Sequence, residues 1–256
     1  MTVNVDPDGP STARMIDYWL GGRHHFPVDV AAARAFESAY RPCAAVFRSL
    51  RAFCGRVVRA IAADGVDRFL VFGAGIPARG AVHELVPRAR VLYTDIDPAI
   101  VAQGQDFLGT KERVKYVLGD ASDPGGIERA ALDQVLPDRA TRPIGLVFLG
   151  LAAFLDDHTL IRTFEALYDM VAPGSRLAFD FDSMELSAHP QALTMMGPSF
   201  HMRQPAAFGA LLGRWRVTGD GIVPVAEWRP NSPPEHVPDA FWGGLAVKNA
   251  ADTFHR

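Results

Sequence analysis

A strand-like apolar run that breaks into a Gly-x-Gly turn limits most strongly what this chain can fold into. Residues 69–72 are Phe-Leu-Val-Phe, and Gly73, Ala74 and Gly75 follow directly. A second apolar run ends in Asp95, twenty residues after Gly75. In open α/β sheets, glycines at such a turn let the backbone approach a nucleotide-type ligand, and an acid at the next strand end binds its ribose. A glycine turn alone also occurs where nothing binds, but together with the acid it predicts a ligand site.

Strand-like and helix-like segments alternate from residue 67 onward, which is typical of a parallel sheet. After residue 182 the alternation becomes irregular. We expect helices near 77–85, 98–108, 126–136, 157–171 and 205–212. We expect seven strands, at 68–72, 90–94, 114–118, 144–150, 176–181, 215–218 and 243–247, with a proline-rich connection at 231–234.

The first 66 residues are predicted to be helical and to form a cap that belongs to the same domain as the ligand-binding part, residues 67–256. The clearest helix spans residues 46–61, where apolar side chains recur at helical spacing. The opposite side of this helix carries Arg48, Arg51, Arg56 and Arg59. Such a charged side is expected to be solvated.

The composition argues against several classes of partner. The net charge of −3 gives no electrostatic reason to bind nucleic acid or an anionic membrane. The start of the chain does not resemble a signal peptide, and no apolar run approaches the ~20 residues of a membrane span. Cys43 and Cys54 form neither a disulfide framework nor a metal site. We therefore expect a cytoplasmic protein with a small-molecule substrate, no nucleic-acid or membrane partner and no metal; a homo-oligomer stays open.

Two cofactors fit the glycine turn. The spacing of Gly73, Gly75 and Ala78 satisfies the loose dinucleotide fingerprint of NAD-binding proteins. Three features favour S-adenosylmethionine: a helical segment precedes the turn, the third strand ends in Leu-Gly-Asp120-Ala121, and an irregular tail follows the five regular strands. Asp120 is well placed to accept a hydrogen bond from an adenine amino group.

Blocks at both ends of the chain carry a family resemblance. Residues 13–22 read Ala-Arg-Met-Ile-Asp-Tyr-Trp-Leu-Gly-Gly, residues 93–98 read Tyr-Thr-Asp-Ile-Asp-Pro, and residues 221–230 contain Val-Pro-x-x-x-Trp-Arg-Pro. With these blocks the chain resembles, over nearly its whole length, the S-adenosylmethionine-dependent methyltransferase-like proteins of high-GC bacteria. The resemblance implies a class I methyltransferase-like (Rossmann-like) α/β fold, with a mostly parallel seven-stranded sheet and helices on both faces.

The resemblance also implies roles for particular residues. The glycine turn would line the methionine and ribose parts of the cofactor, Asp95 would bind the ribose, and Ile96 would pack on the adenine. Asp120 and Ala121 would lie at the adenine amino group, although a Gly-Asp pair also favours a plain turn. Part of a lid would come from Tyr18, Gly21 and Gly22, although Tyr18 also fits an ordinary helix aromatic.

Two positions depart from the methyltransferase pattern. Val71 occupies the place of an acid that usually helps to orient the methionine end of the cofactor, and Ala153 occupies the place of a histidine after the fourth strand. A base is needed only when the acceptor must lose a proton. The main candidates for this base are His24, His25 and Asp180, and His158 and His201 are less favoured candidates.

The leading hypothesis is a methyltransferase that acts on a small molecule, within the range of specialised metabolism. Another use of the same cofactor, aminocarboxypropyl transfer or cyclisation, is an alternative because Val71 and Ala153 depart from the pattern. A non-catalytic cofactor-binding module and a nicotinamide oxidoreductase are the remaining hypotheses, and the fold alone does not separate them.

Overall fold

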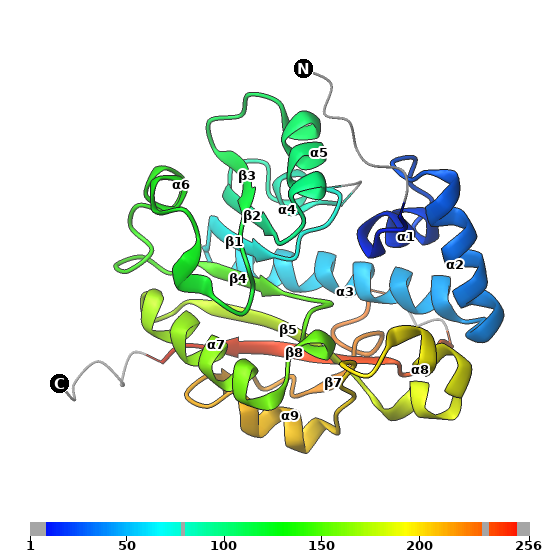
Figure 1. Ribbon diagram of the computed structural model, residues 1–256. Coiled ribbons are helices and arrows are strands. Elements are labelled where there is room, and N and C mark those ends of the chain that lie inside the picture. The colour runs from blue at the N-terminus through cyan, green and yellow to red at the C-terminus, as the bar shows by residue number, and fades with distance from the viewer. Residues whose placement is uncertain (1–8, 78–79, 232–235, 250–256) are drawn as a thin grey trace.

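The computed structural model describes residues 9–77, 80–231 and 236–249, which form one twisted sheet covered by helices on both faces (Figure 1). The sheet has eight strands in the order β3-β2-β1-β4-β5-β8-β6, and β7 pairs with β8. β1 to β5 are mutually parallel, whereas β8 is antiparallel to its neighbours. The strands are β1 (Arg68–Phe72), β2 (Arg90–Asp95), β3 (Val114–Leu118), β4 (Gly145–Phe148), β5 (Arg176–Asp182), β6 (Arg216–Val217), β7 (Val223–Pro224) and β8 (Phe241–Val247).

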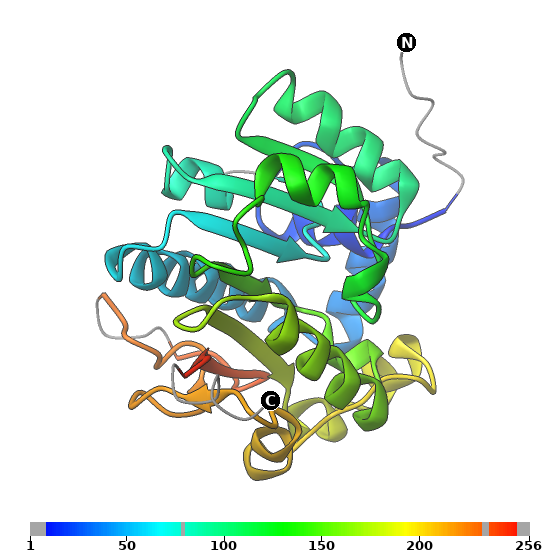
Figure 2. The same cartoon turned by 90° about the vertical axis from the view of Figure 1, so that its left-hand side faces the viewer.

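Alternation along the central strands divides the core into two apolar clusters. In β1, Phe69 and Val71 point to one face of the sheet, and Leu70 and Phe72 point to the other. The first face is covered by α1 (Thr12–Trp19), α2 (Pro27–Ala39), α3 (Cys43–Ala63), α4 (Val82–Leu85) and α5 (Pro98–Leu108). The second face is covered by α6 (Arg129–Val135), α7 (Asp157–Met170) and α9 (Pro205–Leu211), as the turned view of Figure 2 helps to show.

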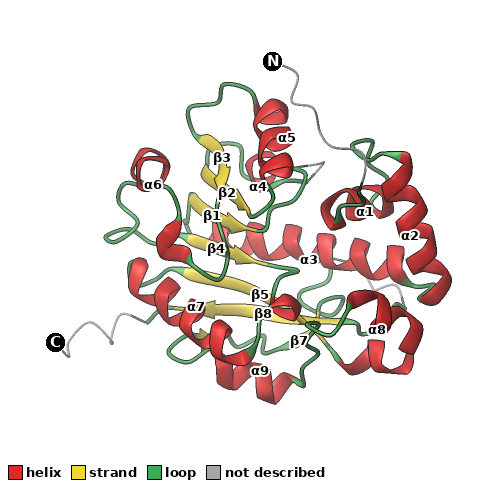
Figure 3. Cartoon of the chain, viewed as in Figure 1, coloured by secondary structure: helices red, strands yellow, loops and turns green. Residues whose placement is uncertain are grey.

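Several helices gather where the parallel strands end. In Figure 3 the arrowhead of β8 points to the left, so the carboxyl ends of β4 and β5 lie to the right. α1, α2 and α8 (Pro190–Met196) lie on that right-hand side. Ligands of open α/β sheets bind outside the carboxyl ends of the strands, so this edge holds the candidate site.

The predicted α/β fold is confirmed, but the sheet has one strand more than the seven expected. β7 is only two residues long and contains Pro224, so it carries no alternating pattern that sequence reasoning could detect. Helix α8 was not expected either. The helix expected over 77–85 begins only at Val82, and Ala78 lies outside the described residues. No helix among the described residues is both long enough and apolar enough to cross a membrane.

Arg56 corrects the expectation that the arginines of α3 form a solvated side. Its guanidinium donates hydrogen bonds to the carbonyl oxygens of Val225 and Trp228. The Trp228 side chain is fully buried, with its ring edge-on to Phe53 at 5.5 Å. Arg56 therefore ties the C-terminal Val-Pro-x-x-x-Trp block to the helix that covers the sheet. Arg48, on the same helix, is exposed as expected.

We expect Arg56→Met to lower the free energy of unfolding by about 1–3 kcal/mol, because the substitution leaves carbonyl groups at a partly buried site without their donor. Arg48→Met is the matched control and should change it by less than about 0.5 kcal/mol. Urea unfolding followed by tryptophan fluorescence measures both. Equal effects of the two substitutions would contradict the assigned role of Arg56.

Candidate functional site

The turn after β1 needs glycine at two positions. Gly73 has φ +52° and Gly75 has φ +60°, values at which a side chain is strained. A Cβ atom on Gly73 would lie 2.4 Å from a methyl carbon of Leu151, in the loop after β4. Steric constraints therefore explain why glycine is needed at this turn.

Asp95 links this turn to the end of β2. Its Oδ2 accepts a hydrogen bond from the Gly75 amide at 2.9 Å, and its Oδ1 accepts one from the Asp97 amide at 3.1 Å. The amide of Ala74 donates to the carbonyl of Thr94 at 2.9 Å. Burial raises the pKa of Asp95, against the lowering effect of these amides. Because each carboxylate oxygen can accept two hydrogen bonds, Asp95 keeps capacity for further donors.

Tyr116 stabilises the glycine turn through a hydrogen bond, a role that the sequence analysis did not predict. Its hydroxyl donates to the carbonyl of Gly75 at 2.7 Å. Its ring stacks on Tyr93, with ring centroids 5.8 Å apart, and fills space beside α5 where a Cβ on Gly104 would lie 2.4 Å away. Glycine in the middle of a helix costs about 0.5–1 kcal/mol relative to alanine. Gly104 was therefore the one sequence signal that something bulky packs against α5.

The ends of β2 and β3 present the residues expected around an adenine. Ile96 is 66% exposed and Leu118 is 54% exposed, so two large apolar side chains stand open at adjacent strand ends. Asp120 is exposed and forms a turn, because its Oδ1 accepts from the amide and the hydroxyl of Ser122 at 2.8 and 2.7 Å. Ala121 is half-buried and packs against the second apolar cluster.

The N-terminal block lies beside the glycine turn. The Cβ of Ala13, on α1, is 3.5 Å from where a Cβ of Gly75 would be. Tyr18 lies on the same short helix, with its ring edge-on to His25 at 5.3 Å and its hydroxyl 3.5 Å from Nε of Arg34. The helix ends in a turn at Gly21, which has φ +75°.

Asp17 organises the loop that contains both candidate histidines. Its buried carboxylate accepts from the His24 amide at 2.7 Å, and Nδ1 of His25 lies 3.0 Å from the same oxygen. A Cβ on Gly22 would overlap this carboxylate, so glycine is required there. The loop also contacts α5, where Gln103 Nε2 donates to the His24 carbonyl at 3.4 Å.

Asp180 lies at the carboxyl end of β5 and is fully buried. Its Oδ1 accepts from the Gly150 amide at 2.6 Å, and its Oδ2 has no partner among the described residues. Burial raises the pKa of Asp180 to about 7. Gly150 precedes Leu151, the residue that touches Gly73, so Asp180 reaches the glycine turn through one loop.

The two remaining candidate histidines, His158 and His201, differ in position. The His201 amide donates to the Ala153 carbonyl at 2.8 Å, so His201 lies beside the segment that follows β4. His158 is exposed in the first turn of α7. No group of three or more potential metal ligands occurs in the described part of the chain.

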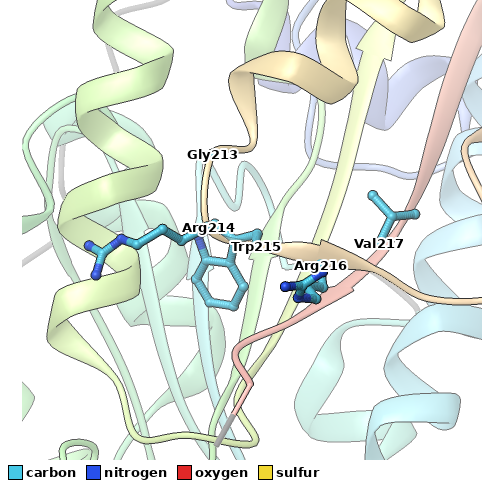
Figure 4. Close-up of a pocket in the computed structure, with 5 residues that line it drawn as sticks. All are labelled: Gly213, Arg214, Trp215, Arg216 and Val217. Atoms are coloured by element: carbon cyan, nitrogen blue, oxygen red, sulfur yellow. The ribbon is translucent and has the colours of Figure 1, made fainter. Parts of the chain in front are cut away.

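A surface depression elsewhere does not belong to this site. Figure 4 shows its lining, Gly213 to Val217, around β6. Arg216 pairs with Val247, which also pairs with Arg176 at the first position of β5. The depression therefore lies at the amino end of β5, opposite the edge that carries Gly73 and Asp95.

Five parallel strands and an antiparallel β8, with a glycine turn after β1 and an acid at the end of β2, define a class I methyltransferase-like fold. Solved methyltransferases share this fold at low identity. N-methyltransferase NodS from Bradyrhizobium japonicum, solved with S-adenosyl-L-homocysteine, is 10% identical with a TM-score of 0.51, over 76% of this chain and 85% of that chain.

The chain belongs to the S-adenosyl methyltransferase family, whose sequence model matches residues 1–249. Its cofactor is accordingly S-adenosylmethionine. A DUF574 family protein from Streptomyces avermitilis is 26% identical, with a TM-score of 0.85 over 96% of this chain and 100% of that chain. A candidate methyltransferase from Thermobifida fusca is also 26% identical, with a TM-score of 0.88 over 96% of this chain and 97% of that chain. No curated protein matches the sequence significantly.

The raised pKa of Asp180 predicts a pH dependence of stability. The folded state keeps a proton on Asp180 from its unfolded pKa of 3.8 up to about 7, whereas the unfolded state has lost it. The free energy of unfolding should therefore fall by about 2–3 kcal/mol between about pH 5 and pH 8 through this group alone. Asp180→Asn should remove that fall, and Asp169→Asn, an exposed aspartate on α7, should keep it. Parallel pH curves of the wild type and Asp180→Asn would refute the assignment.

Proposed function

We propose that this chain transfers a methyl group from S-adenosylmethionine to a small molecule, with the cofactor at the carboxyl ends of β1, β2 and β3. The proposal depends on two contacts of the Asp95 carboxylate. It accepts hydrogen bonds from the Gly75 and Asp97 amides, and its oxygens can accept further hydrogen bonds. Ribose hydroxyls are donors of this kind. A turn without side chains at Gly73 and Gly75, beside a carboxylate that can accept further hydrogen bonds, suits the ribose of the cofactor.

The proposed cofactor site extends from this centre in both directions. Ile96 and Leu118 would cover the adenine, because apolar side chains this exposed gain from contact with a flat aromatic ring. Asp120 and Ala121 would lie at its amino edge. The turn at Gly73, Ala74 and Gly75 would face the methionine part, and Tyr18, Gly21 and Gly22 would close over it from α1.

The chain's own contribution to the reaction is positional. When bound, the cofactor supplies a sulfonium-linked methyl group with a good leaving group. Holding donor and acceptor in line is worth roughly 7–11 kcal/mol in well-oriented systems. A small-molecule acceptor is supported by the helices α1 and α2 at the site edge and by the net charge of −3, which does not favour nucleic acid.

Asp95→Ala should lower the affinity for S-adenosylhomocysteine by at least about 100-fold, since hydrogen bonds to a charged group contribute about 1.5–3 kcal/mol each. Isothermal titration calorimetry measures the loss. Asp97→Ala is the matched control: it removes the N-cap contact to the Ala99 amide, at 2.8 Å, and keeps the backbone amide that donates to Asp95. It should weaken helix α5 and leave the affinity within a few-fold. Retained binding in Asp95→Ala would place the cofactor elsewhere.

Tyr116→Phe should lower the same affinity by about 5–10-fold, because the Gly75 carbonyl loses its donor and the turn loosens. Tyr93→Phe is the control, since its hydroxyl contacts His83 rather than the turn. Both substitutions should reduce the melting temperature, but only the first should reduce affinity. A similar loss of affinity in both would show that the effect is general destabilisation.

The cofactor product distinguishes methyl transfer from other uses of the same cofactor. Mass spectrometry after turnover should show S-adenosylhomocysteine. Methylthioadenosine would instead indicate transfer of the aminocarboxypropyl group, and the proposal would be wrong.

A further inference from the structure

We infer that the acceptor carries an amino group, an ammonium ion at neutral pH, and that Asp180, Asp182 and Tyr40 receive it at the carboxyl end of β5. This inference rests on the proposed methyl transfer and names the substrate class for that site. It depends on where buried negative charge and an unpartnered hydroxyl occur in this structure.

The two aspartates share one face of the sheet. They alternate along β5 with Phe181, so both point to the side of Ala178 and α3. Glu185 lies three residues after the end of β5, in a 3-10 helix, η3 (Met184–Ala188). Burial, and next the charge of Asp180, raise the pKa of Asp182. The charge of Arg203 lowers the pKa of Asp182, but burial outweighs it. Oδ2 of Asp180 has no hydrogen-bond partner among the described residues.

Tyr40, from α2, is an independent indication of a ligand. It is 2% exposed, and its hydroxyl has no hydrogen-bond partner among the described residues. Its ring lies edge-on to His189 at 4.8 Å, and Nε2 of His189 is 3.8 Å from a carboxylate oxygen of Glu185. A buried tyrosine hydroxyl usually finds a partner. An ammonium group can donate to this hydroxyl and to a carboxylate at once.

Arg203, whose charge acts on Asp182, directs its guanidinium hydrogen bonds to other groups. Nε of Arg203 contacts Asp157 at 2.8 Å, and its two terminal nitrogens donate to the carbonyls of Ala152 and Leu155. Its backbone amide, not its guanidinium, bonds to the Asp182 carbonyl. Within the described ranges, the only ion pair formed by Asp180, Asp182 or Glu185 is the one with His189. A cationic acceptor would supply the missing charge, and a carboxylate acceptor would be repelled.

Asp180 lies between the proposed cofactor site and two exposed apolar side chains. Asp180 binds the Gly150 amide, and the next residue, Leu151, lies against Gly73. Phe154 is 50% exposed and Met184 is 42% exposed, at the ends of the segments that follow β4 and β5. They suit the alkyl or aromatic part of an amine.

The proton balance is simple for such an acceptor. The ammonium gives one proton to the Asp180 carboxylate, which leaves a neutral amine. Its lone pair would form the new N–CH3 bond as the S–CH3 bond breaks, with S-adenosylhomocysteine as the leaving group and the methylated ammonium as the product. An acid with a pKa near 7 can take and release that proton near neutral pH. Asp182 and Tyr40 then hold the nitrogen in position.

The test uses full-length protein saturated with S-adenosylhomocysteine and three sets of matched probes. Benzylamine, phenethylamine and hexylamine are each compared with the alcohol and the carboxylate of the same skeleton by ligand-observed NMR. At least one amine should bind about tenfold more tightly than its alcohol and carboxylate counterparts. Asp182→Asn and Tyr40→Phe should each reduce that amine's affinity about 5–10-fold and leave the alcohol within twofold, as expected for loss of one hydrogen bond.

Asp169→Asn, on the opposite side of the sheet, is the control and should keep the full preference. Equal or tighter binding of alcohols or carboxylates, no binding of any amine, or an unchanged preference in Asp182→Asn would each overturn the inference. Binding of S-adenosylhomocysteine is measured separately for every variant, which also verifies folding. Failure of the wild type to bind it would count against the proposed function, whereas binding without amine preference would count against the acceptor class alone.

Discussion

The hydrogen bond from the Gly75 amide to Asp95 holds together the edge of the sheet on which the site depends. β1 and β2 pair in parallel register, so their carboxyl ends reach the same edge. Beyond that edge the chain turns through two glycines with positive φ. The Asp95 carboxylate accepts an amide from this turn and another from Asp97, and the hydroxyl of Tyr116 satisfies the Gly75 carbonyl. A nearly buried carboxylate is costly unless donors surround it, so the acid and the turn stabilise each other.

Buried aspartates that accept hydrogen bonds also organise the N-terminal helices. Asp29 is fully buried, and burial alone would raise its pKa; donors from Arg14, Ser11 and Phe26 outweigh that effect and lower it. Its charge is therefore satisfied within the fold, and it joins α1 to the start of α2. Asp17, one helical turn from Ala13, instead orders the Gly21–His25 loop. One aspartate fixes the two helices, and the other shapes the loop that faces α5.

The sequence was informative where a pattern is long or a residue type is sterically required. The apolar strands at 68–72 and 114–118 and the helix at 98–108 could be placed to the residue, because burial on one or both faces dictates their side chains. The turn at Gly73 and Gly75 could be predicted because few residues adopt positive φ. Arg56, Tyr116 and Asp17 could not be assigned, because their partners lie far away along the chain or are backbone groups. β7 escaped because a two-residue pairing depends on β8 and not on its own sequence.

The position of buried acid on the sheet face toward α3 separates this chain from the common methyltransferase pattern. Val71 in β1 pairs with Val147 in β4, which pairs with Ala178 in β5, so this row of the face is entirely apolar. Asp180 lies two residues beyond Ala178 on the same face, one row nearer the carboxyl edge. The acidic side chain that the family resemblance leads us to expect before the first glycine is thus absent from β1, whereas β5, two strands away, carries one. Asp180 accepts a hydrogen bond from the Gly150 amide, and the next residue, Leu151, lies against Gly73. The loop after β4 therefore links the Asp180 carboxyl group to the glycine turn. The chain can therefore lack an acid at residue 71 and still carry a buried carboxylate at the edge where the reaction is proposed.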